Sequence, residues 1–224
     1  LSIRELQFNE LYSIYNSTST WVKTNGWKDY DTYVSSPNTF EGNTDAVKDF
    51  CRWFGVSCEK YSSDNGDEVF LASELNLGEN GISGALPNSF DTEGGGLGLS
   101  LQTLNMEKNN LVGPIPEMKV LFHGNLENLD LGYNSFTGTL PYSLFFQDDD
   151  TKKGKLQHID FSRLDEIIGP LPSGGKDAKW DNLSSLEFFD LHGCQKLNGT
   201  VPAEALGALE NIVKIRLDGT NLSG

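Results

Sequence analysis

The sequence has few cysteines, few basic residues and no long apolar run. Three cysteines occur among 224 residues, and 17 lysines and arginines face 32 aspartates and glutamates, for a formal net charge of −15. Nucleic acids and anionic membrane surfaces would repel such a chain, so neither is expected as its main partner. It has no initiator methionine, no signal peptide and no apolar run long enough to cross a bilayer. We expect a mature ectodomain or a fragment of one that is not inserted in a membrane.

A pattern of leucine, asparagine, glycine and proline recurs instead along most of the chain. Residues 126–141, LENLDLGYNSFTGTLP, and residues 101–116, LQTLNMEKNNLVGPIP, share it position by position. Further copies begin at Ala72, Leu156 and Leu186, and a sixth begins at Ile212 and stops at Gly224. Five complete copies and a truncated sixth predict a solenoid, in which each unit buries its apolar face against its neighbours.

Each copy contains a short alternation of apolar and polar residues. In one copy Leu129 and Leu131 flank Asp130, and this period of two is typical of a strand with one buried face. Strands that recur once per repeat and run in the same direction stack as a parallel sheet. The asparagine after each strand is expected to turn the chain inward and to satisfy backbone groups that the turn leaves unpaired.

The segments NNLVGPIP at 109–116 and NSFTGTLP at 134–141 resemble the NxLxGxIP signature of plant-type extracellular leucine-rich repeats. The resemblance covers the whole chain through several tandem copies in register. It implies an α/β solenoid: a right-handed superhelix with a parallel β-sheet on its concave face and a helical N-terminal cap. On this basis we divide the chain into a cap, residues 1–68, and the repeats, residues 69–224.

The cap segment carries the same resemblance. CRWFGVSC at 51–58 is similar to the CxWxGVxC signature that closes the cap of such proteins, and the resemblance implies a disulfide between Cys51 and Cys58. Apolar residues at near-helical spacing over 3–15 predict a helix. We interpret the three tryptophans of this segment as cap core, although an aromatic binding surface is the alternative. They are Trp21, Trp27 and Trp53.

Cysteine usage and glycosylation motifs both suggest an extracellular location. The third cysteine, Cys194, stands where Asn134 stands in its own repeat, and a small buried thiol is expected there rather than a reactive or metal-binding one. N-x-S/T motifs are potential N-glycosylation sites of secreted proteins. Four occur, at Asn16, Asn182, Asn198 and Asn221.

Three insertions lengthen the repeats after their prolines. They are DTEGGGLGLS at 91–100, FFQDDDTKKGK at 145–155 and SGGKDAKWDN at 173–182. We expect polar, mobile loops away from the sheet, tolerated as surface insertions. The alternative is a second contact surface with Trp180 as its anchor. Leu164 and Cys194 occupy the asparagine slot in the fourth and fifth repeats, where one extra residue follows, so a distorted turn is predicted there.

Function is sought on the exposed face of the sheet, because register alone determines which residues lie there. The central column is Asn76, Asn105, Asp130, Asp160, Asp190 and Arg216. Like charges stacked at strand spacing repel, so a neighbouring group should offset them. Either this column is a solvated acidic strip, or it binds a basic or hydroxyl-rich ligand. The predicted contacts are Asp130, Tyr133, Asp160, Arg163, Phe188, Asp190 and His192.

A catalytic or metal site on this face is weighed and set aside. His158 and His192 with the aspartates could hold a cation, and Ser162, His192 and Asp190 are the residue types of a hydrolase triad. No oxyanion hole or pocket is evident, and an open sheet does not exclude water. No catalytic residue, metal or cofactor is therefore predicted.

The sequence thus predicts a non-catalytic extracellular recognition module: a receptor ectodomain, a secreted inhibitor or an adhesion protein that binds a protein, peptide or glycan on the concave face. The alternatives are an enzyme or enzyme-targeting domain acting on extracellular polysaccharide, and a structural component of a cell wall or matrix. The column that would carry any specific contact is visible in the sequence, but the ligand is not.

Overall fold

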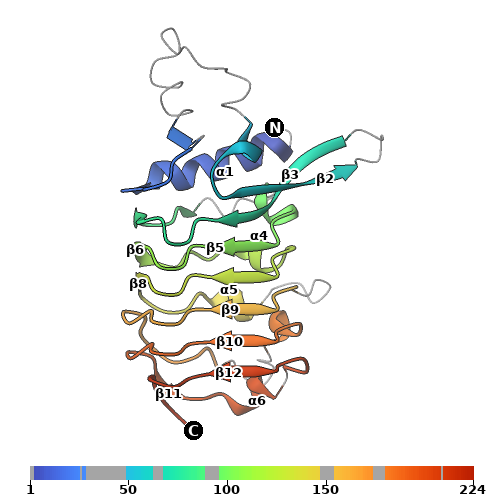
Figure 1. Cartoon of the computed structure of the whole chain (residues 1–224). Helices are drawn as coiled ribbons and strands as arrows, with labels where there is room; N and C mark the ends of the chain where they lie inside the picture. The colour runs from blue at the N-terminus through green and yellow to red at the C-terminus, as the bar shows by residue number, and fades with distance from the viewer. Residues whose placement is uncertain are drawn as a thin grey trace.

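The protein is a single stack of repeats closed at its N-terminal end by a helix (Figure 1). We describe it from a computed structural model, in which the described residues are 3–25, 27–28, 49–62, 68–88, 96–146, 154–173, 180–207 and 209–224. No helix among these residues combines the length and the apolar character that a membrane span requires.

A seven-stranded sheet runs the length of the stack in the order β12-β10-β9-β7-β5-β3-β2. All neighbours are parallel except β2 and β3, which form an antiparallel hairpin. The sequence predicted the parallel strands at these positions and did not predict the hairpin. The strands are β2 (Val56–Ser62), β3 (Glu68–Asn76), β5 (Thr103–Asn105), β7 (Asn128–Asp130), β9 (His158–Asp160), β10 (Phe188–Asp190) and β12 (Lys214–Arg216).

The middle residue of each inner strand points into the core. Leu104, Leu129, Ile159 and Phe189 are all at most 1% exposed, and they lie side by side in consecutive repeats. No repeat could bury this residue alone, because the neighbouring repeats supply its covering atoms. The period-two interpretation of the sequence is therefore confirmed.

A second, smaller set of strands lies along one flank, and the sequence did not predict it. A four-stranded sheet pairs β1 (Thr18–Ser19), β4 (Ser83–Gly84), β6 (Asn110–Pro114) and β8 (Ser135–Thr137). β11 (Asn198–Thr200) pairs with β13 (Asn221–Ser223). Between the two sets, the described residues form only isolated bridges, at Gly138 with Ile167 and at Gly169 with Leu197. This interruption follows Leu164 and coincides with the distorted turns that the sequence predicted.

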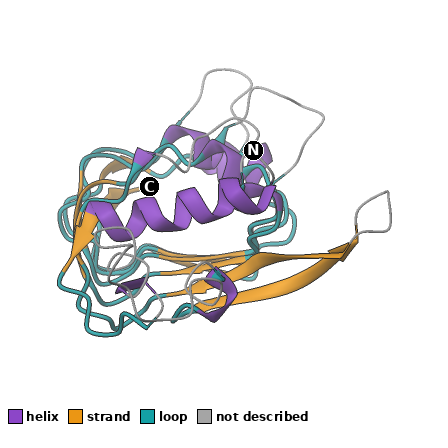
Figure 2. Ribbon diagram, turned by 90° about the horizontal axis from the view of Figure 1, so that it is seen from above, coloured by secondary structure: helices purple, strands orange, loops and turns teal. Residues whose placement is uncertain are grey.

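Short helices lie opposite the seven-stranded sheet, as Figure 2 shows from above. They are η3 (Leu97–Leu99), α4 (Lys119–Phe122), α5 (Tyr142–Phe145), η4 (Asp181–Leu183) and α6 (Ala203–Leu206). The insertions were expected to be polar loops, and their central residues, 91–95, 147–153 and 174–179, lie outside the described residues. Their ends are not polar surface: Leu97, Phe145 and Trp180 are at most 1% exposed.

Trp180 is therefore not the exposed anchor that one interpretation of the sequence proposed. It is fully buried, and its ring centroid lies 4.7 Å from that of Phe145 and 6.1 Å from that of Phe189. Its indole Nε1 donates to the carbonyl of Pro172 at 2.9 Å. Burial of a large aromatic ring with its polar atom satisfied places Trp180 in the core of the fifth repeat.

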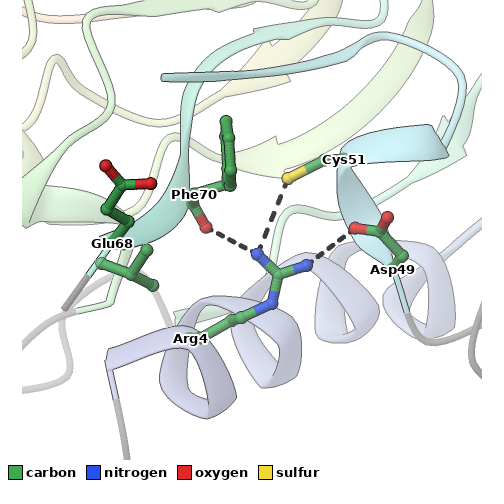
Figure 3. A pocket seen from close by; sticks show the side chains of 6 residues that line it. Arg4, Asp49, Cys51, Glu68 and Phe70 are labelled. Atoms are coloured by element: carbon green, nitrogen blue, oxygen red, sulfur yellow. Dashed lines mark hydrogen bonds and ion pairs between the residues drawn. The ribbon is translucent and has the colours of Figure 1, made fainter. Parts of the chain in front are cut away.

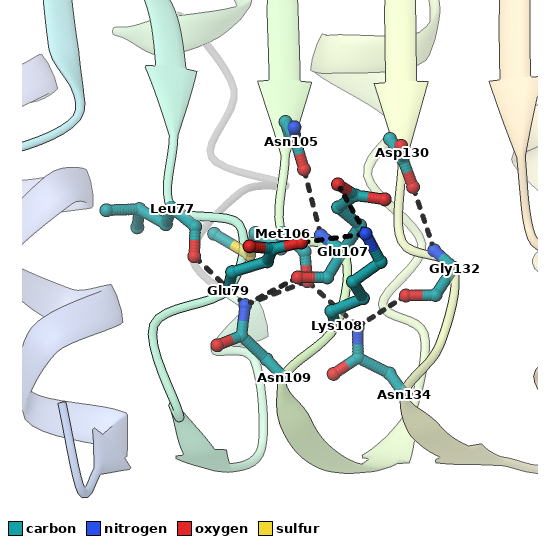
Figure 4. Close-up of polar contacts among 10 residues, drawn as sticks. All are labelled: Leu77, Glu79, Asn105, Met106, Glu107, Lys108, Asn109, Asp130, Gly132 and Asn134. Carbon is teal, nitrogen blue, oxygen red and sulfur yellow. Dashed lines mark hydrogen bonds and ion pairs between the residues drawn. The ribbon is translucent and has the colours of Figure 1, made fainter. Parts of the chain in front are cut away.

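Buried asparagines connect consecutive repeats (Figure 4). The amide of Asn134 donates to the carbonyls of Leu131 and Gly132 in its own repeat and to that of Met106 in the preceding one. Its Oδ1 accepts from the backbone N–H of Leu111 at 3.0 Å. Asn109 makes the corresponding contacts one repeat earlier. Each asparagine thus satisfies turn groups that would otherwise be buried without partners.

Cys194 makes one of these contacts with a thiol. It is fully buried, and its Sγ donates to the carbonyl of Phe161, the counterpart of Met106 in the preceding repeat, at 3.0 Å. Burial raises the pKa of this thiol to about 12. The prediction of a small, buried, unreactive cysteine is confirmed.

The cap covers the first repeat with helix α1 (Ile3–Ser17) and the short helix η1 (Phe50–Arg52). The predicted disulfide between Cys51 and Cys58 is present. Trp27 and Trp53 are at most 2% exposed, and Trp21, whose ring centroid lies 5.0 Å from that of Trp27, is partly buried against the core. The interpretation of the three tryptophans as core residues agrees with this burial, and the alternative of an aromatic binding surface does not.

Helix α1 also fastens the second repeat to the cap through buried polar side chains. Gln7 donates to the carbonyl of Gly96 and to the hydroxyl of Ser100, and it accepts from the backbone of Ala72. Glu10 accepts from the backbone N–H of Leu97 at 2.6 Å. Burial raises the pKa of Glu10, while hydrogen bonds from the backbone oppose that rise.

Candidate functional site

The exposed side of the seven-stranded sheet, called the concave face below, carries the columns that the sequence predicted. The registers pair Asn105 with Asp130, Asp130 with Asp160, and Asp190 with Asp160 and Arg216. The column from Asn76 to Arg216 is therefore continuous across consecutive strands. Strand pairing places these side chains about one strand spacing, 4.7–4.9 Å, apart.

The aspartates of the column have a structural role that the sequence analysis did not identify. Each accepts a hydrogen bond from the backbone N–H two residues further on: Asp130 from Gly132 at 3.0 Å, Asp160 from Ser162 at 2.8 Å, and Asp190 from His192 at 2.7 Å. Asn105 makes the same contact with Glu107 at 2.9 Å, as Figure 4 shows. Asp and Asn favour this local turn, which explains their recurrence at the end of each strand.

The three aspartates differ in what remains available to a ligand. Asp190 is only 2% exposed, and its second oxygen accepts from Nη1 of Arg216 at 3.0 Å. The predicted ligand contact by Asp190 conflicts with this burial, because both carboxylate oxygens are already engaged. Asp130 and Asp160 are half-buried, and each uses only one oxygen in its turn.

The ionised form of Asp130 is disfavoured. Burial raises its pKa to about 7, and the charges of Asp160 and Glu107 add to the rise, whereas the hydrogen bond from Gly132 opposes it. Two features reduce the repulsion that the sequence predicted in this column. Arg216 neutralises the charge of Asp190, and the raised pKa of Asp130 favours the neutral form of that carboxyl group.

A second column runs along the turns that follow the strands, and we call it the turn ridge: Glu79, Lys108, Tyr133, Arg163, Gly193 and Gly219. All six residues adopt a left-handed backbone, with φ between +51° and +77°. Such a conformation suits glycine and is uncommon for residues with side chains. The ridge therefore holds four side chains in a backbone conformation that disfavours them.

The first two side chains of the turn ridge neutralise each other. Nζ of Lys108 lies 2.7 Å from Oε1 of Glu79 (Figure 4). This hydrogen bond and the lysine charge lower the pKa of Glu79. Tyr133 and Arg163, by contrast, are exposed and have no side-chain partner among the described residues. They are the ridge residues that remain free to contact a ligand.

An open pocket of about 390 Å³ lies at the end of the turn ridge next to Arg163. Gly193 and Gly219 contribute to its wall, and Arg163 lies so close to Gly193 that a Cβ there would be 2.6 Å from Cδ of the arginine. His192 also lines it, with Nδ1 2.5 Å from Oδ2 of Asp218. The full lining is Arg163, His192, Gly193, Gln195, Gly219, Thr220 and Asn221.

Phe188 lies on the other side of the central column. Its ring is half-buried, and its centroid is 6.3 Å from that of His158 in the neighbouring strand. Nζ of Lys214 lies over the ring at 5.6 Å from the centroid. Phe188 is thus separated from the turn ridge by the column that contains Asp190, and the structure does not gather the predicted contacts into one pocket.

A second pocket, of about 480 Å³, lies in the cap and is less suited to a ligand (Figure 3). Its cation, Arg4, is already saturated by Asp49 at 2.7 Å and by the carbonyl of Phe70 at 2.6 Å, and one of its nitrogens lies 3.9 Å from the sulfur of Cys51. These contacts tie α1 to the disulfide-bonded segment. The residues that line this pocket therefore hold the N-terminal segment together, and Arg4 is not available to a ligand.

The residue types of a hydrolase triad do not assemble into one. His192 directs Nδ1 to Asp218, Asp190 is engaged by Arg216, and no hydrogen bond joins Ser162 to the imidazole among the described residues. In the same part of the chain, no group of three or more His, Cys, Asp or Glu side chains is placed to hold a metal ion.

The four glycosylation motifs differ in accessibility. Asn16, Asn198 and Asn221 are exposed. Asn182 is fully buried: its Nδ2 donates to the carbonyl of Leu144 at 3.0 Å, and its Oδ1 accepts from the backbone of Gly154. A glycan would replace a hydrogen of that amide and needs space, so the prediction of a glycan at Asn182 conflicts with the fold.

Comparison with known proteins agrees with this architecture. Residues 100–118 and 125–146 match the family described as Leucine Rich Repeat. The fold is a leucine-rich repeat solenoid. None of the curated proteins compared with this chain matches it.

Solved structures with the same fold include plant receptor ectodomains. The LRR ectodomain of the plant membrane receptor kinase GASSHO1/SCHENGEN3 from Arabidopsis thaliana, solved with CASPARIAN STRIP INTEGRITY FACTOR 2, is 27% identical; the match covers 80% of this chain and 18% of that one, with a TM-score of 0.59. The LRR ectodomain of the receptor kinase SOBIR1 from the same plant is 22% identical over 88% of this chain and 96% of that one, with a TM-score of 0.59.

The HAESA ectodomain from Arabidopsis, solved with an N-terminally extended IDA peptide hormone, is 20% identical over 100% of this chain and 30% of that one, with a TM-score of 0.60. This leucine-rich repeat chain thus spans less than a third of the two ectodomains solved with those ligands. At 20–22% identity, the similarity to HAESA and SOBIR1 shows a shared fold and does not identify a ligand.

Proposed function

We propose that the chain is a non-catalytic, extracellular recognition module that binds an extended peptide or protein segment on its concave face. The observation that carries this proposal is the arrangement of Asp130 and Asp160 beside Tyr133 and Arg163. Two partly accessible carboxylates end consecutive strands in register, and two side chains that have no partner among the described residues follow in the adjoining turns.

The open sheet suits an extended ligand better than a small molecule. A segment lying across the strands contacts one or two side chains in each repeat, and its backbone stays within reach of polar groups throughout. Asp130 and Asp160 favour a basic side chain at the centre of such a segment. Because Asp130 has a pKa of about 7, a bound cation would also displace its proton.

The similar structures support the class of function. They are receptor ectodomains, and two of them were solved with a peptide hormone or an integrity factor. The cap disulfide and three exposed glycosylation motifs favour an extracellular location for this chain. We retain the plant-type assignment and the division into a cap at 1–68 and repeats at 69–224 as parts of the proposal.

The absence of a triad among the described residues weighs against hydrolysis on this face. The face is also open to water, which an active site usually excludes. A glycan remains the alternative ligand because the face is rich in polar side chains. Hydrolysis of any member of a panel of cell-wall polysaccharides by the purified chain would overturn the non-catalytic assignment.

The test is a screen of immobilised dodecamer peptides with the purified chain, followed by isothermal titration of the peptides that bind. The informative variant is D130N/D160N, because Asn105 shows that asparagine keeps the turn hydrogen bond in this column. Measured about one to two pH units above the pKa of about 7 of Asp130, where both carboxylates are ionised, the loss of two charges should weaken binding of lysine- or arginine-containing peptides by about tenfold or more.

The matched control removes two charges elsewhere. Glu204 and Glu210 are exposed on and just after helix α6. E204Q/E210Q changes net charge equally and should leave peptide affinity unchanged within about twofold. Equal weakening in both double variants would mean that net charge, and not the concave face, attracts the peptides. A screen without binders would contradict the proposed function.

A further inference from the structure

The disulfide of the cap joins two segments that differ in charge. Cys51 belongs to the short helix η1, and Cys58 belongs to β2, the last strand of the seven-stranded sheet. Both cysteines are only partly buried. The third cysteine, Cys194, is fully buried. The chain therefore has one disulfide within reach of solvent and one thiol that is protected from it.

Positive charge lies beside the sulfur of Cys51. Nη1 of Arg4 is 3.9 Å from this sulfur, as Figure 3 shows. Nη2 of Arg4 contacts one carboxylate oxygen of Asp49, and Nε of Arg52 lies 3.2 Å from the other oxygen. Two arginines thus share one aspartate, and these three side chains together carry a net positive charge next to Cys51.

The charges next to Cys58 have the opposite sign. Glu59 follows Cys58 in β2, is exposed, and accepts a hydrogen bond from the neutral amide of Gln102 at 3.1 Å. The next residue, Lys60, forms an ion pair with Glu68 on β3. Glu59 has no ion-pair partner among the described residues, so its negative charge remains beside Cys58.

Thiol–disulfide exchange is sensitive to such a difference. An external thiolate bonds to one sulfur of a disulfide, and the other sulfur leaves as a thiolate. The two mixed disulfides that can form interconvert, because the released thiolate attacks the sulfur that carries the adduct. The more stable thiolate therefore determines which adduct prevails. A nearby cation stabilises a thiolate, so the favoured thiolate is that of Cys51.

The cap gives a small thiol access to the disulfide and stays folded when the bond opens. The open pocket of about 480 Å³ has Cys51 in its wall. Phe50 and Trp53 are at most 2% exposed, and the backbone N–H of Phe54 donates to the carbonyl of Asn25 at 2.8 Å. The cysteines are only seven positions apart, and a disulfide that closes so short a loop constrains the unfolded chain least.

We propose that Cys58 is a site of reversible modification by a small thiol, with Cys51 as the thiol that reverses it. In the forward step a thiolate bonds to Sγ of Cys58, the bond between the two cysteines breaks, and Cys51 leaves as a thiolate beside Nη1 of Arg4. In the reverse step this thiolate attacks Sγ of Cys58, restores the disulfide and expels the small thiolate. One disulfide and one thiolate are present before and after each step, so no further oxidant or reductant takes part.

The test uses reduced glutathione and, separately, the uncharged thiol 2-mercaptoethanol with the full disulfide-bonded chain. After incubation, free thiols are blocked with N-ethylmaleimide under native conditions, and tryptic peptides are analysed by mass spectrometry. Trypsin separates the three cysteines into DFCR at 49–52, WFGVSCEK at 53–60 and WDNLSSLEFFDLHGCQK at 180–196.

The expected product has the small thiol on Cys58 and maleimide on Cys51. It should exceed the reverse product by about tenfold or more with both thiols, because the preference arises within the protein and not from the charge of the probe. Burial raises the pKa of the Cys194 thiol to about 12. Cys194 should therefore react with neither reagent, and its protection reports that the chain has stayed folded.

Variants separate the two charges that create the preference. R4Q removes the cation next to Cys51 and should bring the two products to within about threefold of each other, whereas R4K keeps a charge there and should retain most of the preference. E59Q removes the anion next to Cys58 and should lower the product ratio by about two- to threefold. K155Q removes an exposed cation in a later repeat and is the matched control, with an expected change below about 1.5-fold.

Four outcomes would overturn the proposal: no adduct while Cys194 stays protected, equal adducts on both cysteines of the wild type, a product ratio that neither R4Q nor E59Q changes, or an adduct that appears only together with labelling of Cys194. The last result would mean that thiols react with the unfolded chain. Arg4 also holds the cap together, so E59Q provides the comparison if R4Q does not fold. These readouts are independent of peptide binding on the concave face.

Discussion

The side chain of Arg163 lies directly across the α-carbon of Gly193, its counterpart in the next repeat. A Cβ at Gly193 would be 2.6 Å from Cδ of the arginine and 3.3 Å from Nη1. The absence of a side chain at one ridge position therefore determines where the side chain of the preceding one can lie.

Replacing Gly193 by alanine should displace Arg163 and strain the turn. The left-handed backbone, with φ of +76°, disfavours alanine, so we expect G193A to lose about 1–2 kcal/mol in the free energy of unfolding. Urea titration followed by circular dichroism measures this loss. Gly207 has a right-handed backbone at φ of −63°, so G207A should change stability by less than about 0.5 kcal/mol. Equal effects of the two substitutions would contradict the assigned role of the left-handed turn.

Asp130 should make the stability of the protein depend on pH. Its pKa is raised from 3.8 to about 7, so the folded state holds this proton at pH values where the unfolded chain has lost it. The contribution of Asp130 to stability should therefore decrease as the pH rises from about 4 to about 7. D130N keeps the turn hydrogen bond, as Asn105 does, and removes the charge.

D130N should be close to the wild type in stability at pH 4 and more stable by about 1–2 kcal/mol at pH 8. We expect no larger gain because partial exposure to solvent reduces the cost of the charge of Asp130. Urea titrations at the two pH values test this difference. The reciprocal change, N105D, adds a carboxylate next to Asp130 and should destabilise the protein at pH 8. A stability gain in D130N that is the same at both pH values would exclude the proton of Asp130 as its cause.

Asn134 should be among the most sensitive polar positions. Its side chain accepts one backbone N–H and donates to carbonyls of two repeats, all of them buried. Truncation leaves these groups without partners, so N134A should lose about 3 kcal/mol. Asn110 is exposed and has no side-chain partner among the described residues, and N110A should be nearly neutral. A neutral N134A would show that water or a rearranged turn replaces the amide.

Trp180 separates the two interpretations of its insertion. Because the ring is fully buried against Phe145 and Phe189, W180A should leave a cavity and lose about 3–5 kcal/mol. Thermal and urea unfolding measure the loss, and V213A, at a side chain that is 83% exposed, serves as the control. A W180A variant as stable as the wild type but impaired in ligand binding would restore the surface-anchor interpretation.

Sequence spacing was sufficient to predict the concave face. The strands around Leu104, Leu129 and Ile159 and the continuous column through Asp130 are present as expected, and they follow from a local period of two. The disulfide at Cys51 was expected because the family resemblance implies it, and it is present. The second set of strands on the flank was missed because it lies among the asparagine, glycine and proline positions of each repeat, which the sequence pattern indicates as turns; β4, for example, is Ser83–Gly84.

The roles of individual side chains were harder to predict, because they depend on neighbours one repeat away. Nothing within the fifth repeat reveals that Asp190 is buried or that Arg216, from the next repeat, neutralises its charge. Likewise the amide of Asn182 meets the backbone of Gly154 and Leu144, 28 and 38 residues away, so a sequence motif alone suggested a glycan there. The left-handed backbone at Tyr133 carried no local signal, since tyrosine is not a residue that such a turn selects.

The sequence by itself determined that the chain is a stack, which residues share a column, and that Asp130, Asp160 and Asp190 lie next to one another. Those properties depend on the period of two within each strand and on the recurrence of the pattern from one repeat to the next, and both can be read from the sequence. Only the tertiary structure decided which of these carboxylates remain accessible, that Trp180 belongs to the core, and that Arg163, which has no side-chain partner among the described residues, lines a pocket. Accessibility and pairing are created by atoms of adjacent repeats, and those contacts exist only once the repeats have stacked.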